Sequence, residues 1–193
     1  MEILNLSSKN YSNIIGKVVK ILKKDGVVVL PTDTVYGLMA DATNKKAVGK
    51  IFKIKKRQKE KWLPLFVKDL KSAKNIAKID KKQERLLKSV WPGKTTVVFK
   101  RKKGIKLYGV DKNTIAIRIP NYPLLNELLC KIKRPLVQTS ANISGKKPLT
   151  NVKAIIKQFK KKPDLIIAVG KVKSAKPSRV INIIGSQIKI LRK

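Results

Sequence analysis

Short apolar runs rich in β-branched residues alternate along this chain with stretches of helical periodicity, and this alternation restricts the fold more than any other feature. The run GVVVLP at 26–31 is continuously apolar, as expected for a strand that is covered on both faces. The segment SNIIGKVVKILKK at 12–24 instead repeats apolar residues every three or four positions. The pattern predicts an α/β class, with a twisted, mixed parallel/antiparallel sheet flanked by helices.

The same periodicities place the remaining elements. Helices are expected at residues 12–24, 44–56, 69–77, 80–90, 122–131 and 151–159. Strands are expected at 26–31, 63–68, 95–100, 114–120, 135–140, 164–170, 179–184 and 187–192. The last two strands are expected to form a hairpin that turns at Gly185-Ser186. No repeat or low-complexity linker divides the 193 residues, which suits one domain over residues 1–193.

The residue types that the chain lacks exclude several kinds of active site. It contains no histidine, and Cys130 is its only cysteine. A His-dependent triad, His-ligated zinc, a thiolate metal cage and an internal disulfide are therefore excluded. No apolar run approaches the roughly 18–20 residues that cross a bilayer, and the start MEILNLSSKN lacks the layout of a secretory signal. We expect a cytoplasmic protein that does not contact membranes.

The net charge of +36 has two interpretations. One is attraction to polyanions such as RNA, DNA or ATP. The other is composition, because only 7 of the 47 basic residues are arginine, and such an excess of lysine resembles the translation of an AT-rich genome. Both interpretations stay open at this point. An arginine that is kept against this bias more often needs its planar fork of hydrogen-bond donors.

Polar segments that contain glycine follow several predicted strands. PTDTVYG at 31–37 follows one apolar run, SANISG at 140–145 follows another, and a weaker example lies at 168–180. In open α/β sheets, ligands bind in the crevice outside the carboxyl ends of the strands, where glycine lets the backbone approach closely. Each segment alone is equally compatible with a capped turn. Two of them in one sheet favour a site for a polar ligand.

The basic segment KIKKRQKEK at 53–61 is the first candidate for anion binding. It is either the solvated end of a helix or a cluster in which Lys55, Arg57 and Lys61 bind a triphosphate. The chain has no GxxxxGK[ST] loop. A nucleotide would therefore have to be bound by basic side chains and by serine and threonine hydroxyls.

Arg118 is the second candidate for anion binding. It alternates with Ile117 and Ile119, so it faces the opposite side of a strand that is expected to be largely buried. A buried arginine is normally paired. Its partner is either a protein carboxylate or the carboxylate or phosphate of a ligand, and the small number of acidic residues, 11, favours the ligand.

Taken together, these segments resemble the YrdC-like family of threonylcarbamoyl-AMP synthases, in its short, single-domain form. The family fold is a twisted α/β sheet with a concave, positively lined cavity. The resemblance covers residues from about 20 to 184 and rests on six motifs: PTDTVYGL at 31–38, Lys55-Lys56-Arg57, WPG at 91–93, TIAIRIP at 114–120, SANISG at 140–145 and PSRVINI at 177–183.

The resemblance implies that the chain forms threonylcarbamoyl-AMP and pyrophosphate from L-threonine, bicarbonate and ATP. Partner proteins would use the product to make threonylcarbamoyladenosine in tRNA. Every reacting species is an anion, so such an enzyme needs positioning and charge neutralisation, with Mg²⁺ arriving on the ATP phosphates. The alternative is a non-catalytic YrdC-like module that binds double-stranded RNA or tRNA. A carbamoyl-transfer relative of the hydrogenase-maturation type would normally bring additional domains.

The resemblance also implies roles for individual residues. L-Threonine would be contacted by Thr32, Arg118 and Ser178. ATP would be bound by Lys55, Arg57, Thr114, Gln138, Ser140 and Asn142. Lys55, Arg57 and Lys61 would act on the phosphates and on the carbonyl-derived oxygens, and no metal-ligating residue is expected. Two questions stay open. Asp33 is either a proton acceptor or a turn cap, and Arg179 follows Ser178 where the family has threonine.

Overall fold

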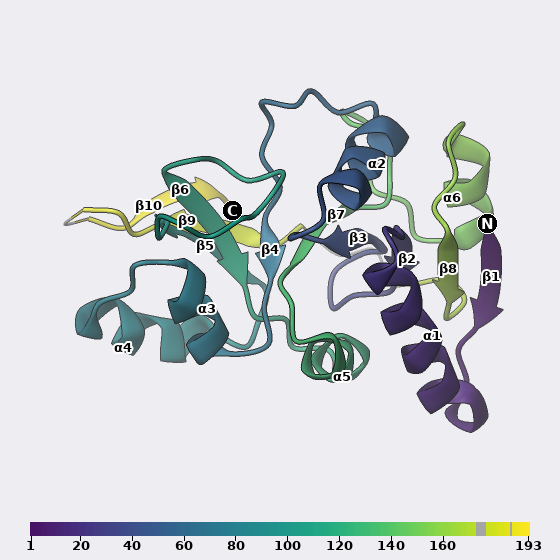
Figure 1. The fold of residues 1–193 in the computed structure, drawn as a ribbon, viewed down its shortest axis with the longest axis horizontal. Coiled ribbons are helices and arrows are strands. Elements are labelled where there is room, and N and C mark those ends of the chain that lie inside the picture. Colours follow the sequence, from purple (N-terminus) through teal and green to yellow (C-terminus); the bar gives the residue numbers. More distant parts are fainter. Residues whose placement is uncertain (173–176, 186) are drawn as a thin grey trace.

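One ten-stranded sheet runs through the computed structural model of the protein, which describes residues 1–172, 177–185 and 187–193 (Figure 1). The strands are β1 (Glu2–Asn5), β2 (Val28–Leu30), β3 (Gly37–Asp41), β4 (Leu65–Phe66), β5 (Thr95–Lys100), β6 (Thr114–Arg118), β7 (Leu136–Ser140), β8 (Leu165–Ala168), β9 (Arg179–Asn182) and β10 (Lys189–Arg192). The helices are η1 (Ser8–Asn10), a single 3₁₀ turn, and α1 (Tyr11–Lys23), α2 (Lys45–Lys55), α3 (Leu70–Ile76), α4 (Lys81–Val90), α5 (Pro123–Ile132) and α6 (Val152–Gln158). In the described ranges, none of these helices has the length and apolarity that crossing a bilayer requires.

The strand order is β1-β8-β2-β3-β7-β4-β6-β5-β9-β10, and neighbouring strands are both parallel and antiparallel. This is the mixed sheet that the sequence predicts, with helices on both faces. α1 and α5 lie side by side against one face, and α2 covers the other (Figure 1).

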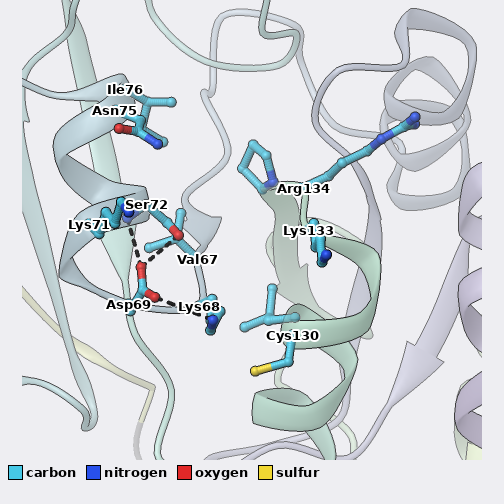
Figure 2. Close-up of a pocket in the computed structure, with 12 residues that line it drawn as sticks. Val67, Lys68, Asp69, Lys71, Ser72, Asn75, Ile76, Cys130, Lys133 and Arg134 are labelled. Atoms are coloured by element: carbon cyan, nitrogen blue, oxygen red, sulfur yellow. Dashed lines mark hydrogen bonds and ion pairs between the residues drawn. The ribbon is translucent and has the colours of Figure 1, made fainter.

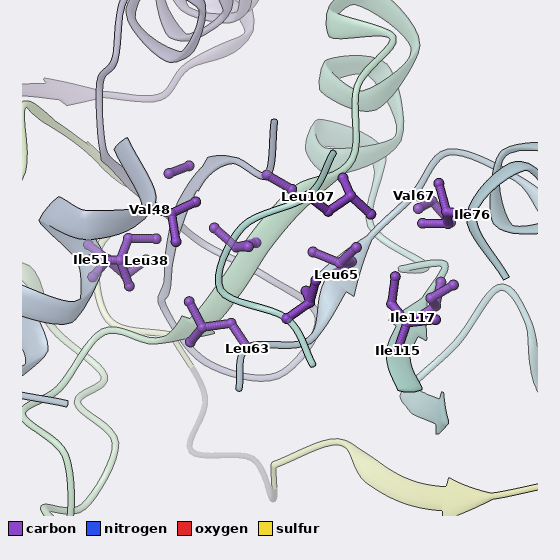
Figure 3. Packing of buried hydrophobic residues seen from close by; sticks show 14 of the residues in the cluster. Leu38, Val48, Ile51, Leu63, Leu65, Val67, Ile76, Leu107, Ile115 and Ile117 are labelled. Carbon is purple, nitrogen blue, oxygen red and sulfur yellow. The ribbon is translucent and has the colours of Figure 1, made fainter. Parts of the chain in front are cut away.

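Two hydrophobic clusters, one on each face of the sheet, explain the continuously apolar runs. Along β2, Val28 and Leu30 belong to the cluster beneath α1 and α5, whereas Val27 and Val29 belong to the cluster beneath α2. All four residues are fully buried. Figure 3 shows part of the second cluster, in which leucine, valine and isoleucine side chains from the sheet and from α2 pack together.

Every predicted helix and strand is present, with shifts of one or two residues at most ends. β9 and β10 form the predicted antiparallel hairpin. Gly185 adopts a φ of 101°, which favours glycine, while Ser186 lies outside the described residues.

Two strands were not predicted, namely β1 and β3. The sequence interpretation treats residues 31–41 as a segment that follows a strand, but Gly37–Asp41 forms β3, which pairs antiparallel with β2. Residues 31–36 are therefore the connection of a hairpin. All five residues of β3 are buried, so β3 lacks the alternation of polar and apolar residues that reveals a half-exposed strand.

The start of β3 brings the two polar segments together. Gly37 pairs with Leu30, the last residue of β2, and also with Ser140, the last residue of β7. A Cβ at Gly37 would lie 2.9 Å from the Met39 Cε atom and 3.1 Å from the Thr32 Cγ2 atom, so a larger residue would disturb this junction. The two segments leave the sheet at one edge, as expected for a ligand crevice.

Candidate active site

A polar cavity of about 220 Å³ lies at this edge of the sheet. Eight of the residues that the sequence assigns to the site line it: Thr32, Lys55, Arg57, Arg118, Gln138, Ser140, Asn142 and Ser178. The described lining also includes Arg192 and Ser144, and it contains no aspartate or glutamate. The cavity is therefore suited to anions.

Two predicted residues lie outside this cavity. Thr114 lines an adjoining cavity of about 320 Å³, which shares Arg57, Pro64 and Arg192 with the polar cavity. Lys61 is exposed and is not among the residues that line either cavity. Its backbone carbonyl accepts a hydrogen bond of 2.6 Å from the Arg57 Nε atom, so Lys61 contributes to the position of Arg57.

Arg118 has a protein partner, contrary to the interpretation that favours a ligand. Its side chain is 2% exposed and forms an ion pair with Asp33, whose side chain is 7% exposed. The Arg118 Nε atom donates to the Gly93 carbonyl at 2.8 Å, and the guanidinium lies 5.4 Å from the centre of the Phe66 ring. Burial lowers the pKa of Arg118, and the Asp33 charge opposes this effect. The WPG turn and the 31–36 connection thus orient Arg118 at the cavity wall.

Asp33 is not the cap of its turn, so the turn-cap interpretation of this residue is wrong. Thr32 caps the turn instead, because its Oγ1 atom accepts from the backbone nitrogens of Thr34 at 3.0 Å and Val35 at 3.2 Å. The Thr32 hydroxyl also donates to the Val35 carbonyl at 2.6 Å. The proposed contact between Thr32 and L-threonine stays a prediction, and this hydroxyl is already engaged.

Lys55 holds the SANISG segment in place. It is 2% exposed, and its Nζ atom donates to the backbone carbonyls of Ser140 and Asn142, both at 2.6 Å. Burial, followed by the charge of Arg57, lowers the pKa of Lys55 to about 7. The ammonium is therefore engaged with the loop, and its predicted contact with phosphate stays untested.

Two polar atoms in the cavity have no hydrogen-bond partner in the described part of the chain. The Asn142 Nδ2 atom donates to the carbonyls of Ile143 at 2.8 Å and Lys146 at 2.6 Å, but the Asn142 Oδ1 atom is buried and unpaired. The Ser144 Oγ atom is likewise buried and unpaired. Buried polar atoms are normally paired, so these two are candidates for ligand contacts. Ser144 lies within the quoted SANISG motif but was not predicted.

Arg192 is the functional candidate that sequence reasoning missed. It reaches Ser178 from β10, where its Nε atom donates to the Ser178 carbonyl at 2.8 Å and its Nη2 atom donates to the Ser178 Oγ atom at 3.0 Å. Burial and the charge of Arg118 lower its pKa. The signal was available, because Arg192 is an arginine in a chain biased towards lysine. Arg179, by contrast, is exposed and absent from the described lining.

A different cavity, between α3 and α5, has none of the predicted site residues. It measures about 320 Å³, and lysines and one arginine stand at its rim (Figure 2). Asp69 caps α3 there, since its Oδ1 atom accepts from the Ser72 backbone nitrogen and hydroxyl, both at 2.7 Å. The carboxylate of this cavity, Asp69, is therefore used to cap a helix. The described lining of the polar cavity instead contains three arginines and the unpaired atoms of Asn142 and Ser144.

Comparisons with known proteins identify the family of the chain. The family model Sua5_yciO_yrdC, described as telomere recombination, matches residues 20–193. A putative threonylcarbamoyl-AMP synthase from Methanocaldococcus jannaschii is 39% identical over 180 residues, which cover 91% of this chain and 85% of the relative. A threonylcarbamoyl-AMP synthase from Idiomarina loihiensis is 32% identical over 170 residues, 86% of this chain and 91% of the relative.

Solved structures share the fold over the whole chain. P. abyssi Sua5 complexed with L-threonine has a TM-score of 0.90 and 29% identity, and it matches 100% of this chain, which spans 57% of the Sua5 chain. E. coli YciO has a TM-score of 0.86 and 27% identity, with 100% of this chain and 94% of YciO covered. The motifs, the family model and the shared fold agree, and the chain belongs to the Sua5/YciO/YrdC family.

Proposed function

We propose that the protein is an L-threonylcarbamoyladenylate synthase, a nucleotidyltransferase that forms threonylcarbamoyl-AMP and pyrophosphate from L-threonine, bicarbonate and ATP. The observation that carries the proposal is the polar cavity, which gathers Arg57, Arg118 and Arg192 around unpaired oxygens of Asn142 and Ser144. The synthase names of the relatives and the L-threonine complex of Sua5 support it.

The reaction needs no nucleophilic side chain. Bicarbonate takes up a proton and loses water to give CO₂, and the threonine amine adds to CO₂ and releases a proton, which leaves a carbamate. A carbamate oxygen then attacks the α-phosphate of ATP as pyrophosphate leaves. The carbamate, the ATP phosphates and the leaving pyrophosphate are anions, so the protein supplies orientation and positive charge. Arginine suits this task because its guanidinium binds carboxylate and phosphate in a planar, two-pronged geometry.

Arg118 is assigned to the carboxylate of L-threonine. A guanidinium has five N–H donors, and among the residues that the structure describes only Gly93 and Asp33 accept from it, at the Nε–H and one Nη2–H. The remaining donors are available to a ligand. Ser178, which directly precedes β9, is assigned to the same substrate, with Arg192 holding it in place.

ATP is assigned to the cations and to the SANISG segment. Arg57 and Arg192 line both cavities and bind the phosphates, while Asn142 and Ser144 offer oxygens towards the ligand. Mg²⁺ enters as part of the ATP substrate, and hydroxyl and amide oxygens are ligands that it accepts. The enzyme works in the cytoplasm and passes its product to partner proteins that modify tRNA.

The test is threonine-dependent release of pyrophosphate. Purified protein is incubated with MgATP and bicarbonate, with and without L-threonine, and the adenylate product is identified by mass spectrometry. Release that requires both L-threonine and bicarbonate is expected. Absent or threonine-independent release would contradict the synthase and leave the RNA-binding module as the alternative, because phosphate-backbone binding requires positive charge but no threonine pocket.

A further inference from the structure

The cavity that adjoins the polar cavity differs from it in chemistry. The two share Arg57 and Arg192, so they meet at two positive charges. Away from these charges, the second cavity is lined mainly by apolar side chains, from Leu63, Val98, Val110, Ile115, Ala116 and Val180. An apolar cavity with a few polar groups is the usual environment of a planar, uncharged ring.

The sizes of the cavities fit a ligand such as ATP that occupies both. Pockets for molecules of this size measure roughly 300–1,000 Å³, whereas the polar cavity measures about 220 Å³ and must also hold the second substrate. If Arg57 and Arg192 bind the phosphates, the nucleoside end extends into the adjoining cavity of about 320 Å³.

Trp62 lines this second cavity and is 47% exposed. Its backbone carbonyl accepts a hydrogen bond of 3.0 Å from the Arg57 Nη2 atom, so residue 62 lies beside an arginine that the proposed function assigns to the phosphates. Exposed aromatic rings beside positive charge are a common platform on which nucleic-acid bases stack.

Asp111 is the carboxylate of the second cavity. Its Oδ1 atom accepts from the backbone nitrogens of Asn113 at 2.9 Å and Thr114 at 2.7 Å, and from the Thr114 hydroxyl at 3.0 Å. No donor in the described ranges bonds its Oδ2 atom. These bonds, the Thr114 backbone bond above all, lower the pKa of Asp111 and keep it anionic. An ionised carboxylate only accepts hydrogen bonds. It therefore suits the 6-amino group of adenine and repels the O6 acceptor of guanine.

We propose that Trp62 and Asp111 select the base of the nucleotide substrate, with Trp62 stacking on the ring and Asp111 accepting from the 6-amino group. Thr114 positions Asp111 through its backbone and hydroxyl. This inference rests on the proposed function only in taking ATP as the nucleotide.

Tryptophan fluorescence tests the stacking directly. The chain has two tryptophans, and Trp91 is buried with its Nε1 atom bonded to the Thr95 carbonyl at 2.8 Å. MgATP is therefore expected to quench the Trp62 emission of the wild type, whereas inorganic tripolyphosphate binds without quenching. W62F should lose the quenching and retain ATP affinity.

W62A should bind ATP about tenfold more weakly, which corresponds to about 1.4 kcal/mol, while its affinity for tripolyphosphate stays unchanged. I3A, which shortens an exposed side chain on the outermost strand β1, is the control. An unchanged ratio of ATP to tripolyphosphate affinity in W62A would overturn the stacking role.

D111N tests base selection. Asparagine keeps the Oδ1 acceptor of the turn but presents an N–H₂ donor in place of the Oδ2 atom. The ratio of ATP to GTP affinity, measured by competition, should fall at least about tenfold, as expected for exchanging an acceptor for a donor against one base edge. D80N, at the exposed N-cap of α4, is the matched control. An equal loss for both nucleotides, or an unchanged ratio, would overturn the role of Asp111.

These measurements omit L-threonine and bicarbonate. If they fail in a protein that releases pyrophosphate with L-threonine, base selection by these two residues is wrong and the synthase stands. If base selection is observed without threonine-dependent release, the proposed function is wrong and the base subsite stands.

Discussion

Arg118 and Asp33 form a buried ion pair, which stabilises the fold only when both partners are present. Two charges with side chains 2% and 7% exposed have lost most of their hydration, and mutual attraction plus the Gly93 hydrogen bond offsets that loss. Removing one partner leaves an uncompensated buried charge. Arg118 is thus both a structural residue and a wall of the cavity, and the two roles need variants that separate them.

The first prediction concerns this pair. R118A should lower the free energy of unfolding by roughly 3–5 kcal/mol, because Asp33 is left unpaired, as measured by urea denaturation. R118K retains a positive charge for Asp33 but loses the planar fork. It should fold, bind ATP almost as well as the wild type, and show a KM for L-threonine raised at least about tenfold, since charged hydrogen bonds contribute roughly 1.5–3 kcal/mol. A normal KM for L-threonine in a folded R118K protein would remove Arg118 from the threonine site.

The second prediction concerns Lys55, whose pKa of about 7 lies below the usual value of about 10.4. Below pH 7 the folded and unfolded chains both carry this proton, and the cost of burying the charge is fully present. Between pH 7 and about 10 the unfolded chain binds more protons, so stability rises with pH. From pH 7 to 9, the wild type should gain on the order of 2 kcal/mol relative to K55M.

Denaturation of both proteins at several pH values measures this difference. K53M, on the exposed side of the same helix, is the control and should follow the wild-type curve. Parallel curves for the wild type and K55M would show that Lys55 does not change its protonation in this range.

At the scale of elements, the predictability of each strand follows from its surroundings. β5 and β6 are recognisable because β-branched residues recur in short runs, and Arg118 is expected on the face opposite Ile117 from alternation alone. β3 is not, because burial of all five residues removes the alternation, and its role as the centre of the site depends on pairing with β2 and β7.

The candidate site was likewise predictable where local sequence patterns reveal it, and not where it depends on tertiary contacts. The strand-end motifs identify residues that line one cavity, because the sequence carries hydroxyls, amides and glycines at those ends. The pairing of Arg118 with Asp33 was not predictable, because the two residues lie 85 positions apart in the sequence. Arg192 is only 14 positions from Ser178 across the predicted hairpin, but the pattern does not show that its side chain turns towards the cavity.

The third prediction concerns the β9–β10 hairpin, which carries Arg192 to the cavity. R192A should lower kcat/KM for ATP by roughly 10- to 100-fold, because a charged hydrogen-bonding group is removed. Its thermal stability should fall less than that of R118A, because Arg192 is partly exposed and has no buried charged partner within the described ranges, whereas Arg118 is buried against Asp33. L191A removes a 59% exposed neighbour from the same strand and is the control. If L191A reduces activity equally, the effect comes from the hairpin and not from the guanidinium.

At the scale of the whole molecule, the structure separates two populations of positive charge. The cavity uses Lys55, Arg57, Arg118 and Arg192. Most of the remaining basic residues are lysines, such as Lys81, Lys82 and Lys88 on α4, which are exposed and distant in sequence from the site. A chain with a net charge of +36 should attract any polyanion through this second population, without reading its sequence.

The last prediction follows from this separation. Binding to tRNA should weaken steeply with salt and should be equally strong for an unrelated RNA of the same length, because each lysine that neutralises a phosphate releases counterions. Replacing Lys81, Lys82 and Lys88 by glutamine should reduce the slope of log affinity against log salt, by up to about 0.7–0.9 for each phosphate that is no longer neutralised. Threonine-dependent pyrophosphate release without RNA should be unchanged, because these three lysines do not line the polar cavity or the cavity that adjoins it. A preference for tRNA that persists at high salt would instead show that the surface reads RNA shape, and that the lysines have been selected for more than charge.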